Sequence, residues 1–267
     1  MPLKTHGLVF LLIKVPLLVR DETRNSQMLK AVIFDMDGVI IDSHPAHREA
    51  WRVFLRSLGR TVSDAELDFV LDGRKRSEIL RHFLGALSED EIREYGEQKD
   101  KFFRQQSLEI SLIPGVIELL TQLRKAGIAT AVATSASENR TRRVLDQLQL
   151  ARKFDAVVSG SDVARGKPDP AIYRVTCQKL GTSPRCAVAI EDAVSGIHAA
   201  RAAGLVCIGL SGHQLPDTLR AAGATHVVGN FLDLSLTQLE AMIQGGDHSR
   251  LRQDTPPFVV SSVPDDF

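Results

Sequence analysis

Residues 30–40, KAVIFDMDGVI, set two carboxylates two positions apart directly after a short apolar run. Successive residues of a strand point to opposite faces, so Asp35 and Asp37 are predicted to point the same way while Met36 turns into the fold. Gly38 allows the backbone to turn and to approach a ligand closely. One acid of such a pair can hold a cation or attack a substrate while the other moves protons. A solvated pair of acids at a strand end is the alternative that this stretch alone leaves open.

The composition is that of a globular protein: 267 residues, 43% of them hydrophobic and 25% charged. This length suits one large domain or two smaller ones. Lysine plus arginine (33) equals aspartate plus glutamate (33), so the net charge gives no indication of a nucleic-acid partner and we expect none. The three cysteines have the spacing of neither a disulfide framework nor a zinc site. We therefore expect a reduced, cytoplasmic setting and a monomer.

The two ends of the chain differ from the rest. Residues 7–19, GLVFLLIKVPLLV, are apolar, but a lysine and a proline interrupt them and the run is too short to cross a bilayer, so no membrane association is expected. A signal peptide is the alternative, although no cleavage pattern follows. We predict a disordered extension over 1–28, with Met28 as an alternative start, and an unstructured tail over 245–267.

Between these ends, short apolar runs alternate with helical patterns. Continuous apolar runs are expected of strands buried on both faces, as in a parallel sheet. Apolar residues at helical spacing predict helices over 115–126 and 138–149. Glycines are predicted to end four helices, at Gly127, Gly181, Gly204 and Gly223. The alternation predicts a doubly wound α/β domain. Its strands are expected at 31–34, 128–133, 155–159, 186–190, 206–209 and 226–228.

One gap interrupts the alternation, because the first two predicted strands lie too far apart for a single crossover. Residues 44–112 are expected to contain helices only, with capping boxes at 63–66 (SDAE) and 88–91 (SEDE). We therefore predict an all-helical domain over 44–112, inserted into a core formed by 29–43 and 113–244. An insertion at this point lies over the carboxyl edge of the sheet, where open α/β folds bind ligands.

The loop after the second predicted strand is rich in hydroxyl groups. The segment TSASENR (134–140) offers Thr134, Ser135 and Ser137 at the start of a helix. Free N–H groups at a helix N-terminus bind phosphate, so this loop is a candidate phosphate site. Simple N-capping by Ser137 is the alternative.

The loop after the third predicted strand carries a lysine in a stiff turn, RGKPDPAIY (165–173). Pro168 stiffens this turn, Asp169 is predicted as the N-cap of the next helix and Pro170 as its first residue. Lys167 is therefore expected to be held at the sheet edge rather than to extend into solvent.

The loop after the fourth predicted strand adds two adjacent acids, Glu191 and Asp192, in IEDAVSG (190–196). Acids before a helix can simply complement its dipole, which is the alternative. Taken together, however, the four loops bring carboxylates, a hydroxyl and an ammonium to one edge of the sheet. This combination favours a hard cation together with a phosphate group.

The four motifs DMDG, TSASENR, GKPDP and IEDAVSG resemble, in order and spacing, those of the haloacid dehalogenase superfamily of phosphotransferases. The resemblance covers about 29–230. It extends to the subgroup that carries a helical cap after the first motif, which includes small-molecule phosphatases and β-phosphoglucomutase. The resemblance therefore implies a Rossmann-like core with an inserted helical cap.

The resemblance also implies a division of roles between the acids. Asp35 is expected to attack phosphorus and form an aspartyl phosphate, while Asp37 gives a proton to the leaving oxygen and then activates the incoming water or hydroxyl. Magnesium is expected to be held by Asp35, the backbone carbonyl of Asp37 and Asp192, with Glu191 close by or bound through water.

Two further residues are assigned in the same way. Ser135 and Lys167 are expected to hold the phosphoryl oxygens, and Lys167 also offsets the charge of Asp35. The aspartate at position 37 argues against a dehalogenase, which does not need this proton donor.

The cap is expected to choose the substrate. His47 and Trp51 lie four residues apart on one helix face, as in the mutases, and Lys99 is a third candidate for the site. Gly73 and Arg76 stand where mutases have a loop that holds the second phosphate of the substrate. Core packing of Trp51 is the alternative.

The cap loop also departs from the mutase pattern, at Arg74 and Lys75, and a solvated basic turn over 74–76 is the alternative. We therefore predict a magnesium-dependent phosphatase that hydrolyses a small phosphate ester such as a sugar phosphate, with a β-phosphoglucomutase-like activity as the second hypothesis. A receiver-like signalling domain is a remote third hypothesis, because such domains lack both the two-acid motif and the helical insertion.

Overall fold

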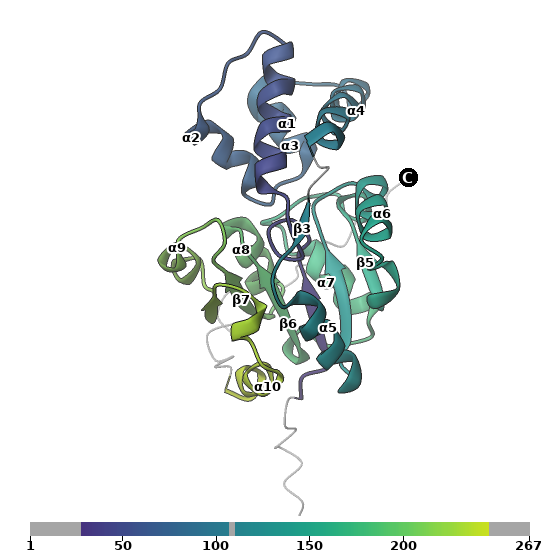
Figure 1. Ribbon diagram of the computed structural model, residues 1–267, viewed down its shortest axis with the longest axis vertical. Helices are drawn as coiled ribbons and strands as arrows, with labels where there is room; N and C mark the ends of the chain where they lie inside the picture. Colours follow the sequence, from purple (N-terminus) through teal and green to yellow (C-terminus); the bar gives the residue numbers. More distant parts are fainter. Residues whose placement is uncertain (1–27, 107–109, 246–267) are drawn as a thin grey trace, which may run out of the picture.

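The computed structural model describes residues 28–106 and 110–245, and its centre is a six-stranded parallel sheet (Figure 1). The strand order is β5-β4-β1-β6-β7-β8, so β1 lies in the middle. Ala31 of β1 pairs with Ala129 on one side and Ala187 on the other. The strands are β1 (Ala31–Phe34), β4 (Ala129–Ala133), β5 (Ala156–Val158), β6 (Ala187–Glu191), β7 (Val206–Leu210) and β8 (His226–Val228).

Helices cover both faces of this sheet. Val32 and Phe34 of β1 pack into an apolar cluster with α5 (Val116–Lys125), α6 (Glu138–Gln147) and α10 (Leu236–Gly245). The alternate residues, Ala31 and Ile33, pack on the other face with α7 (Ala171–Lys179), α8 (Val194–Ala202) and α9 (Pro216–Ala221). The predicted doubly wound α/β fold is confirmed, and each predicted strand is present to within about a residue at either end.

The start of α7 differs in detail from the expectation. Pro170 is the N-cap and Ala171 the first helical residue, one position later than predicted. Asp169 still binds the helix end, because its carboxylate accepts a hydrogen bond of 2.9 Å from the Ala171 N–H. Five short 3-10 helices complete the described chain: η1 (Asp68–Leu71), η3 (Ala151–Lys153), η4 (Gly160–Asp162), η5 (Pro184–Cys186) and η6 (Phe231–Asp233).

The insertion after β1 forms a helical cap above the carboxyl edge of the sheet (Figure 1). Its helices are α1 (His44–Ser57), α2 (Asp64–Leu67), α3 (Arg76–Leu84) and α4 (Glu89–Gln106), and they enclose an apolar core of their own. Both predicted capping boxes are present: Ser63 and Ser88 each exchange hydrogen bonds with the glutamate three residues on.

The prediction that 44–112 contains helices only is wrong at its end. Residues Ser111–Leu112 form strand β3, which pairs antiparallel with β2 (Ile41–Asp42). The chain leaves the core along β2 and returns along β3, so the two connections satisfy each other's backbone groups. We propose this pair as the junction between cap and core; the boundaries 29–43, 44–112 and 113–244 otherwise stay predictions.

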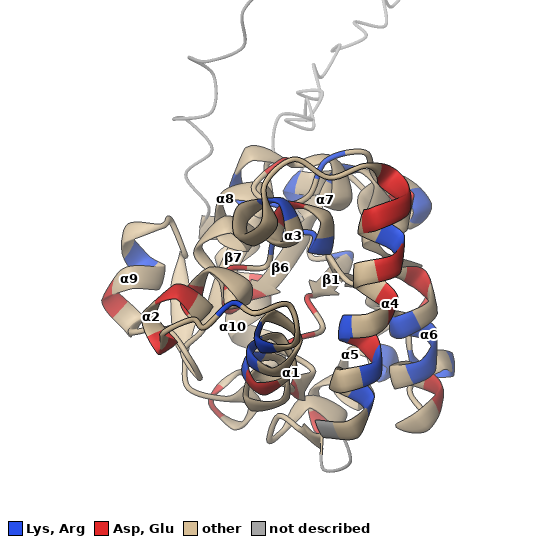
Figure 2. Cartoon of the chain, turned by 90° about the horizontal axis from the view of Figure 1, so that it is seen from above, with Lys and Arg blue, Asp and Glu red and all other residues tan. Residues whose placement is uncertain are grey.

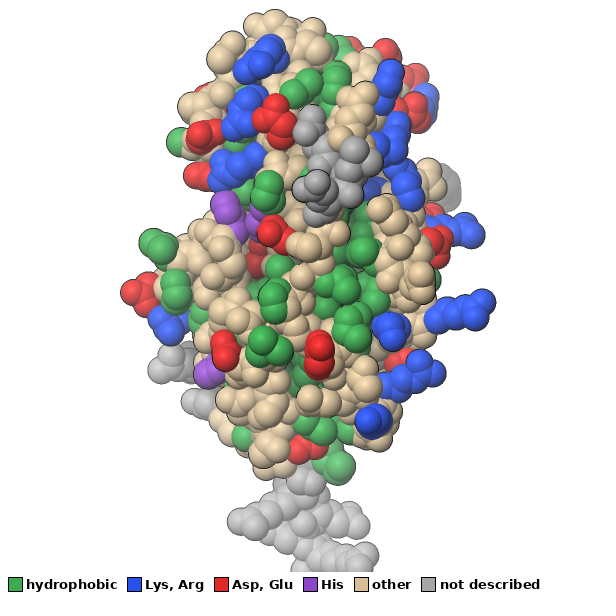
Figure 3. Space-filling model, in the orientation of Figure 1, with side chains coloured by type: hydrophobic (Ala, Val, Ile, Leu, Met, Phe, Trp, Pro, Cys, Tyr) green, Lys and Arg blue, Asp and Glu red, His purple; other side chains and the backbone are tan. Residues whose placement is uncertain are grey.

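The surface agrees with the balanced composition. Acidic and basic residues are mixed over the helices that surround the sheet end (Figure 2), and a waist separates cap from core in the space-filling view (Figure 3). Within the described ranges, no helix combines the length and apolar character needed to cross a bilayer. The predicted extension and tail lie outside the described residues, apart from Met28 and Gly245 at their edges.

Candidate active site

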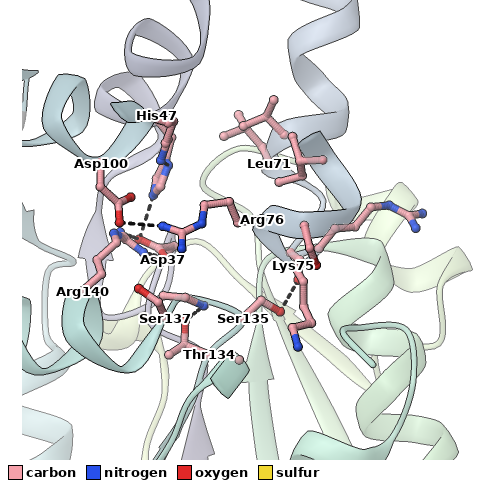
Figure 4. Close-up of a pocket in the computed structure, with 18 of the residues that line it drawn as sticks. Asp37, His47, Leu71, Lys75, Arg76, Asp100, Thr134, Ser135, Ser137 and Arg140 are labelled. Carbon is pink, nitrogen blue, oxygen red and sulfur yellow. Dashed lines mark hydrogen bonds and ion pairs between the residues drawn. The ribbon is translucent and has the colours of Figure 1, made fainter. Parts of the chain in front are cut away.

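A cavity of about 300 Å³ lies between the cap and the carboxyl edge of the sheet (Figure 4). Both acids that follow β1 line it, and Met36 between them is buried in the core, so the predicted alternation is confirmed. The cavity also brings together most of the residues predicted from the sequence: Ser135 and Asp192 from the core, and His47, Trp51, Gly73, Arg76 and Lys99 from the cap.

Asp35 is buried at the floor of this cavity, with 4% of its surface exposed. Lys167 Nζ lies 2.8 Å from its Oδ1 atom. Burial raises the pKa of Asp35 to about 6, because loss of solvation outweighs the attraction of the ammonium. Burial alone would lower the pKa of Lys167. The attraction of Asp35 and Glu191 outweighs this effect and holds the pKa of Lys167 above its usual range. Near neutral pH the site therefore contains an ionised carboxylate beside a fixed cation.

Three carboxylates form the only acidic cluster found among the described residues that could hold a metal ion. Asp35, Glu191 and Asp192 each offer an oxygen, and these atoms all lie within 4.8 Å of one another. Lys167 Nζ is 2.5 Å from Glu191 Oε1, which also accepts a hydrogen bond from the Tyr173 hydroxyl. Glu191 Oε2 is buried without a hydrogen-bond partner in the described chain, and burial raises the pKa of this residue to about 8. The crowding of carboxylates fits a cation.

Gly38 allows the acids to come this close. Its φ angle is +75°, and a Cβ atom at this position would collide with the carboxylate of Asp192 and the ring of His44. His44 Nε2 itself lies 3.1 Å from Asp192 Oδ2. Gly38 therefore turns the chain and, because it has no side chain, leaves space for the Asp192 carboxylate.

Asp37 has different surroundings from Asp35. Arg140 binds it through two nitrogens, at 2.7 Å to Oδ2 and 2.5 Å to Oδ1. The Ser43 hydroxyl donates to Oδ1 at 2.5 Å, and His47 Nε2 lies 3.4 Å from the same oxygen. Burial alone would raise the pKa of Asp37, but the Arg140 guanidinium holds it well below its usual range. The carboxylate is absent from the acidic cluster, so only its backbone carbonyl stays a predicted metal ligand.

His47 connects this acid to the cap. Its Nδ1 atom lies 3.0 Å from Lys99 Nζ, and its Nε2 atom, on the other side of the ring, is the one that faces Asp37. Lys99 is 3% exposed and lies over the rings of Trp51 and Phe103, at 5.3 and 4.9 Å. Burial lowers the pKa of Lys99 to about 7.

The hydroxyl loop contacts the cap. Ser135 Oγ donates to the Gly73 carbonyl at 2.5 Å, so the predicted phosphate ligand is held against the predicted substrate loop. Thr134 Oγ1 accepts from the Ala136 N–H at 3.2 Å. Ser137 is the N-cap of α6 and lines the cavity. Its side chain makes no capping hydrogen bond, so its hydroxyl is not used to cap the helix.

The basic residues of the cap loop are partnered rather than solvated. Arg76 donates to Asp100 at 2.7 Å and to the Gly96 carbonyl at 3.2 Å, while Lys75 Nζ donates to the Val163 carbonyl at 2.8 Å. Arg74 is likewise paired, with Asp72, and lies over the ring of Phe69. The alternative of a solvated turn over 74–76 is therefore wrong.

Other predicted residues take less direct positions. Trp51 is 1% exposed and belongs to the apolar core of the cap, so the core alternative holds even though its edge lines the cavity. Lys167 and Glu191 are fully buried and lie beneath the cavity rather than in its wall, where they contact Asp35.

Several contacting residues escaped the sequence-based prediction, among them Arg140, Tyr173, Ser43 and His44. The first two stand in the opening turn of a helix that follows a sheet strand, and such turns face the carboxyl edge of the sheet. That placement is a usable signal for Arg140, which lies three residues after Ser137. Nothing in the sequence pattern shows that it would reach Asp37.

Comparisons with known proteins agree with this geometry. The model of the haloacid dehalogenase-like hydrolases matches residues 29–204. The chain belongs to this family. The phosphorylated carbohydrates phosphatase of Thermotoga maritima is 35% identical over 207 residues, which cover 75% of this chain and 94% of that protein. The β-phosphoglucomutase of Bacillus subtilis is 32% identical over 237 residues, which cover 85% of this chain and 100% of that protein.

A solved structure agrees with both. A hydrolase of family IA, variant 3, from Entamoeba histolytica superposes with a TM-score of 0.73 at 28% identity, covering 81% of this chain and 100% of that one. The family, the fold and the prediction that the chain is an enzyme are therefore confirmed. The roles of the individual site residues stay predictions.

Proposed function

We propose that this family member is a magnesium-dependent phosphatase that hydrolyses a small phosphorylated metabolite, such as a sugar phosphate, through an aspartyl phosphate. One observation carries the proposal: the buried Asp35 carboxylate lines the cavity between cap and core, with Lys167 in contact with it and the second acid, Asp37, lining the same cavity. The likeness to the phosphorylated carbohydrates phosphatase of Thermotoga maritima supports a sugar phosphate as substrate.

The chemistry is assigned to two acids. An Asp35 oxygen attacks phosphorus, the bond to the leaving oxygen breaks, and that oxygen takes a proton from Asp37. A water molecule then gives a proton back to Asp37 and attacks phosphorus, which releases inorganic phosphate and restores Asp35. Ser135 and Lys167 are proposed to bind the phosphoryl oxygens, since a hydroxyl and an ammonium stand beside Asp35 at this edge.

The acidic cluster fits a magnesium ion. Asp35 and Asp192 would hold it through carboxylate oxygens, with the Asp37 carbonyl and with Glu191, whose Oε2 atom is buried and unpartnered within the described chain. A bound cation neutralises charge that would otherwise repel the phosphate from Asp35. Lys167 supplies the second neutralising charge from the protein itself.

A sugar-phosphate mutase is the second candidate, supported by the likeness to the Bacillus subtilis β-phosphoglucomutase along that protein's whole length. Both activities share the aspartyl phosphate, so the acids do not distinguish them. The difference lies in whether the closed cap excludes water until a second hydroxyl of the sugar reaches the phosphate. Arg74 and Lys75 bind cap and core groups in the loop where mutases hold their second phosphate, which favours the phosphatase.

The deciding experiment offers the purified protein a panel of phosphate esters with magnesium. The panel contains p-nitrophenyl phosphate and β-glucose 1-phosphate, the latter with a trace of the 1,6-bisphosphate. Phosphate release and glucose 6-phosphate formation are measured together, with Asp35→Asn as the inactive control. We expect phosphate release to dominate, and glucose 6-phosphate formation that outpaces it would establish the mutase instead.

A further inference from the structure

Both carboxylate oxygens of the second acid, Asp37, have protein donors before any substrate is present. Both Asp37 oxygens accept hydrogen bonds from Arg140, and Oδ1 also accepts one from Ser43. A general acid or base must present an oxygen to the substrate within hydrogen-bond reach. In the arrangement described here, the Asp37 carboxylate faces a guanidinium instead, so it must be released before it can exchange protons with a leaving group or water.

Arg140 itself is built into the site rather than extending from its surface. It is 6% exposed, it lines the cavity, and its guanidinium lies 4.5 Å from the centre of the Phe103 ring on cap helix α4. Its Nε atom is buried and has no hydrogen-bond partner in the part of the chain that the structure describes. A planar guanidinium with an unused donor is suited to bind a phosphate or carboxylate through two parallel hydrogen bonds.

A second cation stands in the same part of the cavity. Lys99 is 3% exposed and contacts His47 and two aromatic rings, but within residues 28–106 and 110–245 no carboxylate lies within ion-pair distance of its Nζ atom. Figure 4 shows Arg140 and Arg76 converging on this side of the cavity, around Asp100 and Asp37. An anionic group placed here would meet donors that the protein leaves incompletely satisfied.

We propose that Arg140 is a specificity-determining residue that keeps Asp37 engaged until a second anionic group of the substrate takes its place on the guanidinium. This inference rests on the proposed function and narrows its substrate class to phosphate esters that carry another phosphate or a carboxylate. When a second anion of the substrate replaces Asp37, the buried guanidinium stays paired. A substrate without that anion would leave the guanidinium unpaired if Asp37 moved away, which is costly. Esters with the second anion therefore release Asp37, and simple esters leave it bound.

The test compares substrates that differ in the second anion. We would measure kcat/KM for p-nitrophenyl phosphate and β-glucose 1-phosphate, which lack it, and for β-glucose 1,6-bisphosphate and phosphoglycolate, which carry a phosphate or a carboxylate. Arg140→Gln should raise kcat/KM for the first pair about threefold and lower it about tenfold for whichever of the second pair the wild type prefers. The preferred member of that pair identifies the anion.

Arg142→Gln is the matched control, because Arg142 lies on the same helix with its side chain 81% exposed, and it should change neither rate. Arg140→Lys keeps the charge without the paired hydrogen bonds. It should also raise kcat/KM for the esters without a second anion and lower it for those with one, by smaller factors than Arg140→Gln. It serves as the test if Arg140→Gln does not fold. Equal losses for both substrate groups, or a wild type without preference for the second anion, would overturn the proposal.

A binding measurement separates this inference from the proposed function. In an Asp35→Asn background, calorimetry with β-glucose 1,6-bisphosphate and β-glucose 1-phosphate needs no turnover. Adding Arg140→Gln should weaken binding of the bisphosphate about tenfold and leave that of the monophosphate unchanged. If the wild type releases no phosphate from any ester but this difference persists, the proposed hydrolysis fails and Arg140 keeps its role. Equal effects on both ligands, with normal hydrolysis, would reject Arg140 alone.

Discussion

At Asp35, burial and charge act against each other. Loss of solvation raises the pKa of the carboxyl, and the Lys167 ammonium opposes it, with a net value of about 6. A carboxylate with this pKa is largely ionised at pH 7 and more basic than an exposed aspartate, which suits a nucleophile. Lys167 also contacts Glu191, so one ammonium lies between two acidic side chains.

The nucleophile can be tested by a substitution that keeps its shape. Asp35→Asn should lower the turnover of any substrate by about four orders of magnitude or more, because the amide cannot form the acyl phosphate. The melting temperature should change little or rise, since a buried charge is removed. Turnover within a few-fold of wild type would remove Asp35 from this role.

The two acids at the end of β6, Glu191 and Asp192, should differ in their importance for the metal. Asp192→Ala should raise the magnesium concentration needed for half-maximal activity about tenfold or more. Glu191→Gln should raise it less, because one Glu191 oxygen already contacts Lys167 and fewer of its oxygens are left for the metal. Magnesium binding measured by calorimetry should follow the same order. Identical magnesium titrations for both variants and the wild type would exclude this loop as the metal site.

Lys99 predicts an unusual dependence of stability on pH. Burial lowers its pKa from 10.5 to about 7, so between pH 7 and 10.5 the unfolded chain binds more protons than the folded one. The contribution of Lys99 to the free energy of unfolding therefore becomes more favourable as the pH rises from 7 to 10.5. The excess stability of Lys99→Met over wild type should shrink by about 2 kcal/mol between pH 7 and pH 9.

Urea unfolding of both proteins at the two pH values measures this change, and the comparison cancels the titration of all other groups. Parallel stability curves would show that the lysine stays protonated in the folded protein.

Among the elements, α4 connects the helical cap to the candidate active site. It presents Lys99, Asp100 and Phe103 to the cavity and its surroundings, and it packs along α1, which carries His47. Its N-terminus is secured by Ser88, whose side chain accepts the Glu91 N–H while Glu91 binds the Ser88 N–H. Local capping therefore supports groups about three helical turns away.

Ser88→Ala should destabilise the protein by about 1 kcal/mol, because the first turn of α4 loses its side-chain acceptor. Ser88→Thr retains the acceptor and is the control. Urea unfolding followed by circular dichroism gives the comparison, and equal stability of the alanine and threonine variants would count against the cap.

At the scale of the molecule, cap and core are joined by polar contacts around one cap loop. The Gly73 carbonyl accepts from Ser135, Lys75 donates to the Val163 carbonyl, and Glu78 accepts from the Gly166 N–H at 3.2 Å. The Asp72 carbonyl also accepts from the Ser195 hydroxyl. The loop thus contacts all three core segments that follow β4, β5 and β6, and these contacts hold the cap closed over the cavity.

Glu78→Ala should loosen this closure. We expect faster hydrogen exchange at the Gly166 amide, measured by mass spectrometry on a peptide spanning 160–167, because that N–H loses its acceptor. Glu97→Ala is a control on the exposed side of α4 and should leave the peptide unchanged. Unaltered exchange in Glu78→Ala would show that the contact does not restrain the cap.

Local sequence pattern was enough to predict the parallel sheet, the helical insertion and the acids at the strand ends. Strand runs such as 31–34 are apolar because both faces are buried, and this periodicity is a local signal. The placement of Asp35, Ser135, Lys167 and Asp192 at one edge follows from it, because parallel strands end together. Strands β2 and β3 escaped prediction, since a two-residue strand carries no periodicity.

The contacts between residues at that edge depend on how the cap and core pack, and local pattern does not predict them. Arg140 reaches Asp37 across 103 positions of the chain, and Lys75 reaches Val163 across 88. Such partners depend on helix positions and rotamers that no spacing rule encodes. The same holds for the pKa of Lys99, which burial sets. Local pattern therefore predicts which polar groups lie at the site. The packing of cap on core determines which of these groups form hydrogen bonds and ion pairs with each other.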